Sequence, residues 1–206
     1  MNKFKLTTNT KIHFGKTLFQ IEALISFRNV KAGDLGGWIE RENNLSHDGD
    51  AWVSGDAKVY GDAQVYGDSW VYGDARVSGN AQVYGNAQVF GDAQVYGDAQ
   101  VYGDAQVFGN AQVYGNAWLY GDAWLYGNAQ VSGDSDICWF SNVGSEFGTL
   151  TVYKTKDGIG VTRGCFDGTL EEFEASAKKR HGESRVGNEY ELLIKLIKLK
   201  LGSDDV

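Results

Sequence analysis

The residues that could support acid–base chemistry are few and scattered. The three histidines, His13, His47 and His181, all lie outside the repetitive central segment of the chain. The sequence contains no nucleophile–base pair, no metal-ligand spacing and no phosphate-binding loop. His47 precedes the first repeat and is the best-placed candidate base, although a place in a turn or cap explains it better. We therefore expect no catalytic residue, no metal site and no cofactor.

Two basic residues and a set of aromatic residues are stronger candidates for binding. Lys58 and Arg76 stand eighteen residues apart, so they are neighbours if one turn of the fold takes eighteen residues, and together they could meet a phosphate group. The aromatic residues follow the same spacing, and their rings could stack on a base or pack on a protein. They are Trp52, Trp70, Tyr72, Phe90, Phe108, Trp124 and Tyr126.

A six-residue repeat positions these side chains. Glycine stands at every sixth position from Gly49 to Gly133, and each unit reads Gly–Asp/Asn–Ala–X–Val–Tyr. Ala and Val lie two apart, which is the period of a β-strand, so they share one side while X and Tyr share the other. Glycine with Asp or Asn then breaks the strand, because these residues tolerate left-handed backbone conformations. Such short, regular strands predict stacked coils, in which each strand pairs in parallel with its copy one turn later.

The repeat resembles the hexapeptide-repeat family. The resemblance lies in an aliphatic residue such as Val53, Val59 or Val65 that stands two places after a small residue such as Ala51, and it covers almost half of the chain. It implies a left-handed parallel β-helix with three hexads in each coil. At a strand spacing of about 4.8 Å, about five coils then make a prism about 24 Å long. The predicted fold is mostly β, a solenoid with a cap at each end.

Eighteen residues to the coil sort the outward side chains into three faces. The first face carries the aromatic set, with Gln88 and Gln106 between its tryptophans; the second carries Lys58 and Arg76; the third carries glutamines, Trp118 and finally Asp136. A patch as apolar as the first face is rarely left uncovered. We therefore expect it to be buried against another subunit or against the terminal segments, and the two glutamines would need hydrogen-bond partners there. The family resemblance favours a homotrimer, with a dimer as the alternative.

The corners of the coils predict where the negative charge lies. The hexads hold eleven aspartates and only two basic residues, so they carry a net charge of −9 and the rest of the chain carries +1. Turn formation and solubility explain this acidity. Calcium bridging along a column and mimicry of a phosphate backbone are sharper alternatives, although calcium needs more oxygen ligands than single aspartates offer. The charge argues against direct binding to nucleic acid or to an anionic membrane.

The N-terminal 48 residues predict a β cap on the solenoid. Short strands are expected at Phe19–Leu24 and Ser26–Val30, followed by a turn-rich segment at 33–39 that leads into the first coil. A cap is needed because an open coil end exposes core and strand edges. The β-helix is then expected at 49–143.

Residues 144–206 predict a C-terminal ββαα module. We expect a hairpin of Thr149–Thr155 with Ile159–Phe166, a helix from a capping box at Thr169 to Gly182, and a second helix at Asn188–Leu201. The module could cap the last coil, mediate oligomerisation or bind a target.

The compartment is expected to be the cytoplasm. No apolar run is long enough to span a bilayer, and no segment resembles a signal peptide. Cys138 and Cys165 stand far apart and fit a reducing compartment better than a disulfide framework.

The flanks of the repeat add a second resemblance. Segments 30–53 and 150–182 resemble parts of uncharacterised hexapeptide-repeat proteins that are common in phages, prophages and bacteria and are usually labelled polymer-forming proteins or transferases. This resemblance implies a phage origin but supplies no established activity.

Three functions stay open at this level. The first is a non-catalytic, oligomeric binding protein that sequesters or blocks a protein or a small nucleotide, as an inhibitor of a bacterial defence protein or a sponge for its nucleotide signal would. The second is a self-assembling structural scaffold. The third is an acyl-coenzyme-A-dependent acyltransferase, because many members of the resembled family have that activity. Such enzymes usually carry a loop that interrupts the coils, whereas these hexads contain no interruption and no histidine.

Overall fold

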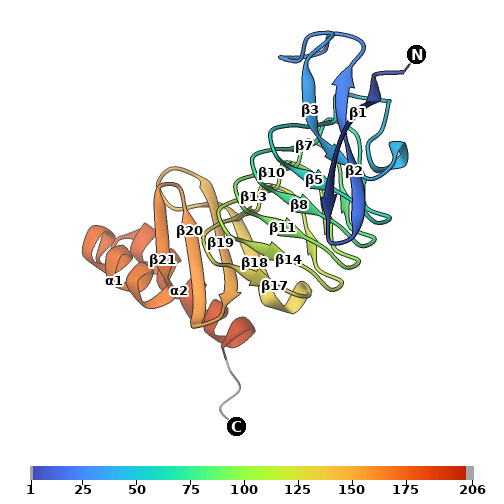
Figure 1. Cartoon of the computed structure of the whole chain (residues 1–206). Coiled ribbons are helices and arrows are strands. Elements are labelled where there is room, and N and C mark those ends of the chain that lie inside the picture. Colours follow the sequence, from blue (N-terminus) through green and yellow to red (C-terminus); the bar gives the residue numbers. More distant parts are fainter. Residues whose placement is uncertain (1, 203–206) are drawn as a thin grey trace.

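The middle of the chain forms a column of stacked coils (Figure 1). The computed structural model describes residues 2–202, apart from the side chain of Asp134. Within these residues, three sheets run along the column, and every third hexad contributes a strand to the same sheet. Strand partners are parallel and eighteen residues apart, as in Gln88 with Gln106. The predicted parallel β-helix of about five turns is therefore confirmed, while its left-handedness stays a prediction.

Each face of the column corresponds to one sheet. The first face consists of β4 (Trp52–Val53), β7 (Trp70–Val71), β10 (Gln88–Val89), β13 (Gln106–Val107) and β16 (Trp124–Leu125). The second consists of β5 (Lys58–Val59), β8 (Arg76–Val77), β11 (Gln94–Val95), β14 (Gln112–Val113) and β17 (Gln130–Val131). The third consists of β6 (Gln64–Val65), β9 (Gln82–Val83), β12 (Gln100–Val101) and β15 (Trp118–Leu119).

The interior of the column is filled by small and aliphatic side chains. The alanine and the valine or leucine of the hexads are between 0% and 1% exposed. Ser69 replaces one alanine and is also buried, because its hydroxyl donates to the Tyr66 and Val83 carbonyls at 2.8 and 3.0 Å. The predicted assignment of Ala and Val to the inside is confirmed.

The corners require glycine. The hexad glycines from Gly49 to Gly127 have φ between 61° and 74°, a region that other L-residues rarely adopt. Gly133 instead has an extended φ of −164°, and a short 3₁₀ helix at Asp134–Asp136 follows it. Asp136 accepts hydrogen bonds from the Ser132 amide and hydroxyl and pairs with Lys154, which ends the coil. The expected fifth strand on the third face, at Asp136, is therefore wrong.

The N-terminal cap extends the second-face sheet beyond the first coil. β1 (Phe4–His13) and β2 (Lys16–Ala23) form an antiparallel hairpin, β2 pairs with β3 (Leu35–Ile39), and β3 pairs in parallel with β5. β2 confirms the strand predicted near Phe19–Leu24. The strand predicted at Ser26–Val30 is wrong, because Phe27 and Val30 close a tight turn in which Arg28 has φ of 42°.

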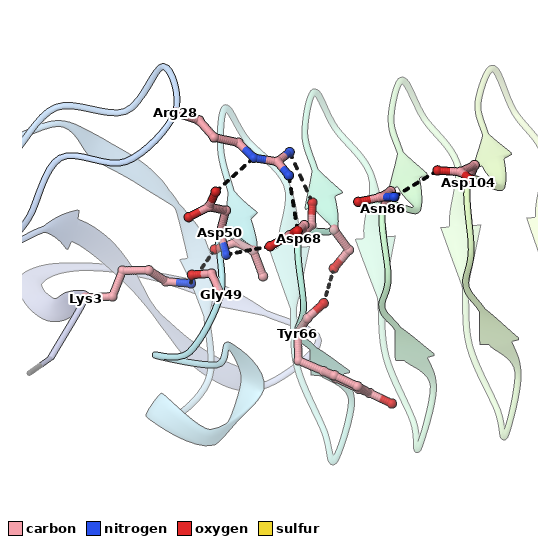
Figure 2. Close-up of polar contacts among 10 residues, drawn as sticks. Lys3, Arg28, Gly49, Asp50, Tyr66, Asp68, Asn86 and Asp104 are labelled. Carbon is pink, nitrogen blue, oxygen red and sulfur yellow. Dashed lines mark hydrogen bonds and ion pairs between the residues drawn. The ribbon is translucent and has the colours of Figure 1, made fainter.

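Two buried polar side chains complete the first coil. Lys3 is 1% exposed, and its Nζ donates to the carbonyls of Gly49 and Ala51 at 3.1 and 2.8 Å (Figure 2). The Asn44 amide, at the end of a 3₁₀ helix (Glu42–Asn44), donates to the carbonyls of Gly61 and Ala63 at 3.0 and 2.8 Å. In the following coils, backbone amides bind the equivalent carbonyls. Lys3 and Asn44 therefore satisfy carbonyl groups of the first coil that have no preceding coil to bind them.

The C-terminal part is a four-stranded antiparallel sheet with two helices. The strands are β18 (Ile137–Val143), β19 (Gly148–Thr155), β20 (Gly158–Arg163) and β21 (Phe166–Thr169). The predicted hairpin is present as β19 and β20, but β18 and β21 flank it, so the expected ββαα module is incomplete. The helices lie on the side of this sheet away from the coils (Figure 1).

Capping residues set the helix bounds. α1 (Leu170–His181) begins with the predicted capping box, in which the Thr169 hydroxyl accepts from the Glu172 amide and the Thr169 amide donates to the Glu172 carboxylate, and it ends at Gly182. α2 (Arg185–Leu201) begins three residues earlier than predicted, because Ser184 accepts a hydrogen bond from the Gly187 amide.

The C-terminal sheet closes the last coil. The Thr151 hydroxyl accepts from the Trp124 amide at 3.2 Å, and the Thr162 hydroxyl donates to the Trp124 carbonyl at 3.1 Å. Tyr153 is buried with the core of the column, whereas Leu150 and Val152 belong to the second core beneath the helices. Alternate residues of β19 therefore serve the two cores, and capping the solenoid is one role of this module.

Candidate functional site

A row of stacked aromatic rings runs along the first face. Tyr72 and Phe90, and then Phe90 and Phe108, lie with ring centroids 4.8 Å apart and planes 3° from parallel. Phe108 and Tyr126 follow at 4.6 Å with a tilt of 40°. The parallel pairing of the strands fixes this spacing, since it is the distance between neighbouring coils. The row therefore follows the spacing of the coils, and only its last ring departs from parallel.

Coverage of the first face changes along the column. Trp52 is 2% exposed, because Phe27 of the N-terminal cap packs edge-on against it at 5.4 Å. Trp70, Tyr72, Phe90 and Phe108 are half-buried, and at the other end Trp124 and Tyr126 are 42% and 37% exposed. Of the two expected covers, the terminal segment thus covers the first coil, and the rest of the row faces outward.

Hydrogen bonds between tyrosine and glutamine occur on all three faces. A tyrosine hydroxyl donates to the glutamine sixteen residues later at Tyr66–Gln82, Tyr72–Gln88, Tyr84–Gln100 and Tyr96–Gln112, at 3.0 to 3.2 Å. Burial raises the pKa of the Tyr66, Tyr72 and Tyr96 hydroxyls. The phenylalanines of the first face lack this hydroxyl, so the centre of that face is the most apolar stretch of the ladders. Gln88, which was expected to need a hydrogen-bond partner, accepts this bond from Tyr72.

Acidic columns border the first face. On one side lie Asp50, Asp68, Asn86, Asp104 and Asp122, and on the other Asp56, Asp74, Asp92, Asn110 and Asn128. The Asn86 amide donates to the Asp104 carboxylate at 2.9 Å, and Arg28 pairs with Asp50 and Asp68 at 3.1 and 3.5 Å (Figure 2). Asparagine in a column therefore replaces repulsion between stacked carboxylates with a hydrogen bond. Carboxylates therefore lie on both sides of the aromatic row, at Asp104 and Asp122 on one side and at Asp74 and Asp92 on the other, with neutral asparagines among them.

The last coil carries a second aromatic group that the sequence-based site omits. Trp118 and Tyr120 of the third face are 46% and 43% exposed, and Trp139 packs edge-on against Tyr120 at 4.5 Å. With Ile137 and Cys138 they line an open hollow of about 410 Å³. The signal was present in 117-AWLYGDAWLY-126, where tryptophan replaces glutamine in two successive hexads.

In the expected anion site at Lys58 and Arg76, the lysine is already paired within the chain. The strands do bring the two residues side by side. Lys58, however, is only 8% exposed, and its Nζ bonds the Asp56 carbonyl and carboxylate at 2.6 and 2.8 Å. Lys11 contacts the same carboxylate. Burial alone would raise the pKa of Asp56, but the bonds from Lys11 and Lys58 outweigh it and lower that pKa to about 2.

The histidines lie in structural surroundings. His47 Nδ1 accepts from the Lys3 amide at 3.1 Å, its Nε2 lies 2.8 Å from Glu42 Oε1, and its ring stacks on Phe4. Both ring nitrogens of the candidate base are thus occupied. His13 packs edge-on against Tyr60, and burial and then the nearby Lys58 charge lower its pKa. His181 lies beside Tyr190 in the C-terminal module.

Three further observations concern the expected ligands and surroundings. Across residues 2–202, no group of three or more His, Cys, Asp or Glu side chains is arranged to hold a metal ion. No helix in the same range has both the length and the apolar character to cross a membrane. Cys138 and Cys165 are free thiols.

The coils are similar to a known repeat family. The model described as YdcK Beta solenoid repeat matches overlapping segments at 70–85, 81–97, 93–109, 99–115 and 105–121. No curated protein matches the chain. The matched segments lie within the stacked coils that carry the aromatic row. The chain is therefore a repeat β-helix protein with coils similar to the YdcK β-solenoid repeat.

Proposed function

We propose that this chain is a non-catalytic binding protein that holds a protein partner on its first face. The observation that carries the proposal is the row of half-exposed rings from Tyr72 to Tyr126, set between two acidic columns. The rings are held by the coil spacing, so little side-chain entropy is lost when they are covered. Aromatic side chains bury a large area at protein interfaces, and tryptophan and tyrosine are enriched among the residues that contribute most to binding.

The charge around the row indicates the chemistry of the partner. Carboxylates on both sides favour a surface with apolar side chains flanked by lysine or arginine, because complementary potentials steer association and exclude wrong partners. The same charge disfavours nucleic acid. We therefore favour a basic protein over a nucleotide signal, for which Lys58 is occupied by Asp56. The resemblance to phage proteins suggests that this partner is a bacterial defence protein that the chain blocks or sequesters.

The two alternative functions receive less support. A scaffold that grows end to end needs open coil ends, whereas Lys3, Asn44 and β3 cover one end and the threonines of the C-terminal sheet cover the other. An acyltransferase needs a free base, whereas both nitrogens of His47 are engaged. Binding through the first face, in contrast, needs only the aromatic rings that are already accessible there.

Matched pairs of outward substitutions test this function. Tagged protein expressed in its native host is purified as wild type, as Phe90→Gln/Phe108→Gln on the first face, and as Tyr84→Gln/Tyr102→Gln at the same coils on the third face. We expect the wild type and the third-face variant to retain the same co-purifying protein at fixed stoichiometry and the first-face variant to lose it. Circular dichroism and thermal unfolding check that all three proteins keep the fold. Retention by the first-face variant, or loss by both variants, would refute the proposal.

A further inference from the structure

Helix α2 carries apolar side chains on two opposite sides. Tyr190, Ile194, Ile197 and Leu201 are buried against the C-terminal sheet and α1. At 100° per residue, Leu192, Leu196 and Leu199 fall on the opposite side, within a stripe about 60° wide. They are 68%, 39% and 81% exposed. The first stripe is satisfied within the chain, and the second, which we call the outer stripe, is not.

From this second stripe we infer that two copies of the chain pair through α2. The helices would lie antiparallel about a twofold axis, with the outer stripe of each packed on that of the other. A stripe of this kind is self-complementary, because an isologous contact buries the same residues on both sides. Spacings of four and three residues also place the leucines as successive contacts along one seam.

The charges beside the outer stripe fit antiparallel pairing. Glu189 and Lys200 lie on the same edge of the stripe at 100° per residue. When Leu192 of one copy faces Leu199 of the other, Glu189 comes within about one helical turn of Lys200 of the second copy, and the contact occurs twice. Glu189 is held in place because it accepts a hydrogen bond from the Gly144 amide at 3.1 Å.

The other edge of the stripe fits the same arrangement. Near the twofold axis, Lys195 of one copy would approach Lys195 of the other. Glu191 of the same chain already pairs with each Lys195 at 2.6 Å, which reduces the repulsion between them. Lys198 pairs in the same way with Glu174 of α1 at 2.7 Å. Because two of the three lysines beside the outer stripe are paired within the chain, the described part of its rim keeps only Lys200 as a free cation, which is less than an anionic membrane surface would favour. A second copy is the occupant that both edges favour.

Pairing through α2 leaves the first faces free. The helices lie beyond the C-terminal sheet, at the end of the molecule opposite the N-terminal cap (Figure 1). A dimer would therefore present two first faces, and a partner with two sites would bind it more tightly than a single chain. The pairing does not depend on the proposed function of that face, and it predicts a dimer where the family resemblance favours a trimer.

Light scattering of the full chain across a micromolar concentration series tests the pairing. We expect a mass of twice the chain mass of 22.6 kDa, falling toward one chain on dilution. Leu199→Lys should raise the dissociation constant about tenfold or more. The matched control Leu35→Lys replaces an exposed leucine at the other end of the molecule and should not change it. Lys200→Glu should weaken the dimer, because it would place a carboxylate near Glu189 of the second copy.

Three results would overturn the inference. One is a monomer throughout the concentration series. Another is an oligomer that Phe90→Gln/Phe108→Gln dissociates while Leu199→Lys does not, which would assign the contact to the first face. The third is a monomer that binds phosphatidylserine vesicles in a flotation assay and loses that binding in Leu199→Lys, which would assign the outer stripe to a membrane surface.

Discussion

Lys3 gives the capped solenoid a measurable pH dependence. Its ammonium group is buried against the first coil, where it donates to the carbonyls of Gly49 and Ala51. Desolvation lowers its pKa from 10.5 to about 8, and the surrounding aspartates only partly oppose this shift. The perturbation we consider is Lys3→Met, which keeps the side chain as far as Cε and removes the titrating amino group.

The sign of the effect follows from proton binding. Between the folded pKa of about 8 and the unfolded value of 10.5, the unfolded chain holds the Lys3 proton and the folded chain has released it. Stability from this group is therefore lowest below pH 8 and rises with pH. For these two values the gain between pH 7 and pH 9.5 is about 2 kcal/mol in the free energy of unfolding.

Urea unfolding of the wild type and of Lys3→Met at both pH values measures this gain. All other titrating groups are common to the two proteins, so the difference between their free energies of unfolding isolates Lys3. We expect the wild type to gain about 2 kcal/mol relative to the variant as the pH rises. A difference that stays constant, or a wild type that loses stability relative to the variant, would refute the assignment of Lys3 as a buried end cap.

Three substitutions test how the coils and caps are held together. Gly36→Ala would place a Cβ 2.6 Å from a carbonyl oxygen of the first coil, so we expect a loss of about 3 kcal/mol in urea unfolding. The control for space is Gly133→Ala, where the backbone is extended and nothing lies within 4 Å of the added Cβ. Asn86→Asp should cost about 1 kcal/mol at low salt and less at high salt, because it replaces the bond to Asp104 with repulsion; a loss independent of salt would contradict this. Thr162→Val should cost about 1 kcal/mol and speed amide exchange in the last coil, and unchanged exchange there would refute its capping role.

The repeat made most of the fold predictable. A period of six with Ala and Val two apart fixed the strands, the inward side chains and the columns of eighteen residues, and Gly49 to Gly127 marked the corners. The capping box at Thr169 located α1 for a similar reason, because its signal is local. Local signals are the ones that a single sequence carries well.

Long-range contacts account for what could not be predicted. β1 reads as a polar, threonine-rich segment, and it is a strand because β2 pairs with it. Lys58 looked free for a ligand because the hexad alone does not show that Lys11 and Lys58 share the carboxylate of Asp56. In the same way, nothing in the sequence around Lys3 indicates that its side chain binds the carbonyls of the first coil. These roles follow from how the N-terminal cap folds onto the column.

The candidate surface was predicted in outline. The aromatic column was visible in the spacing of Trp70, Phe90 and Trp124, but its coverage depends on Phe27, which approaches Trp52 from the cap. The exposed pair Trp118 and Tyr120 was less clear, because one tryptophan among glutamines reads as a variation of the repeat. Exposure depends on the caps, and the hexads do not encode it.

Photocross-linking in living host cells tests most directly whether the first face is the binding surface. A photoreactive phenylalanine analogue is placed at position 90 on the first face or, as a control, at position 84 in the same coil on the third face. We predict a cross-link from position 90 to one other protein, absent from position 84 and weakened by raising the salt concentration in lysates. No cross-link from position 90, cross-links only between copies of the chain, or equal cross-linking from both positions would contradict the account.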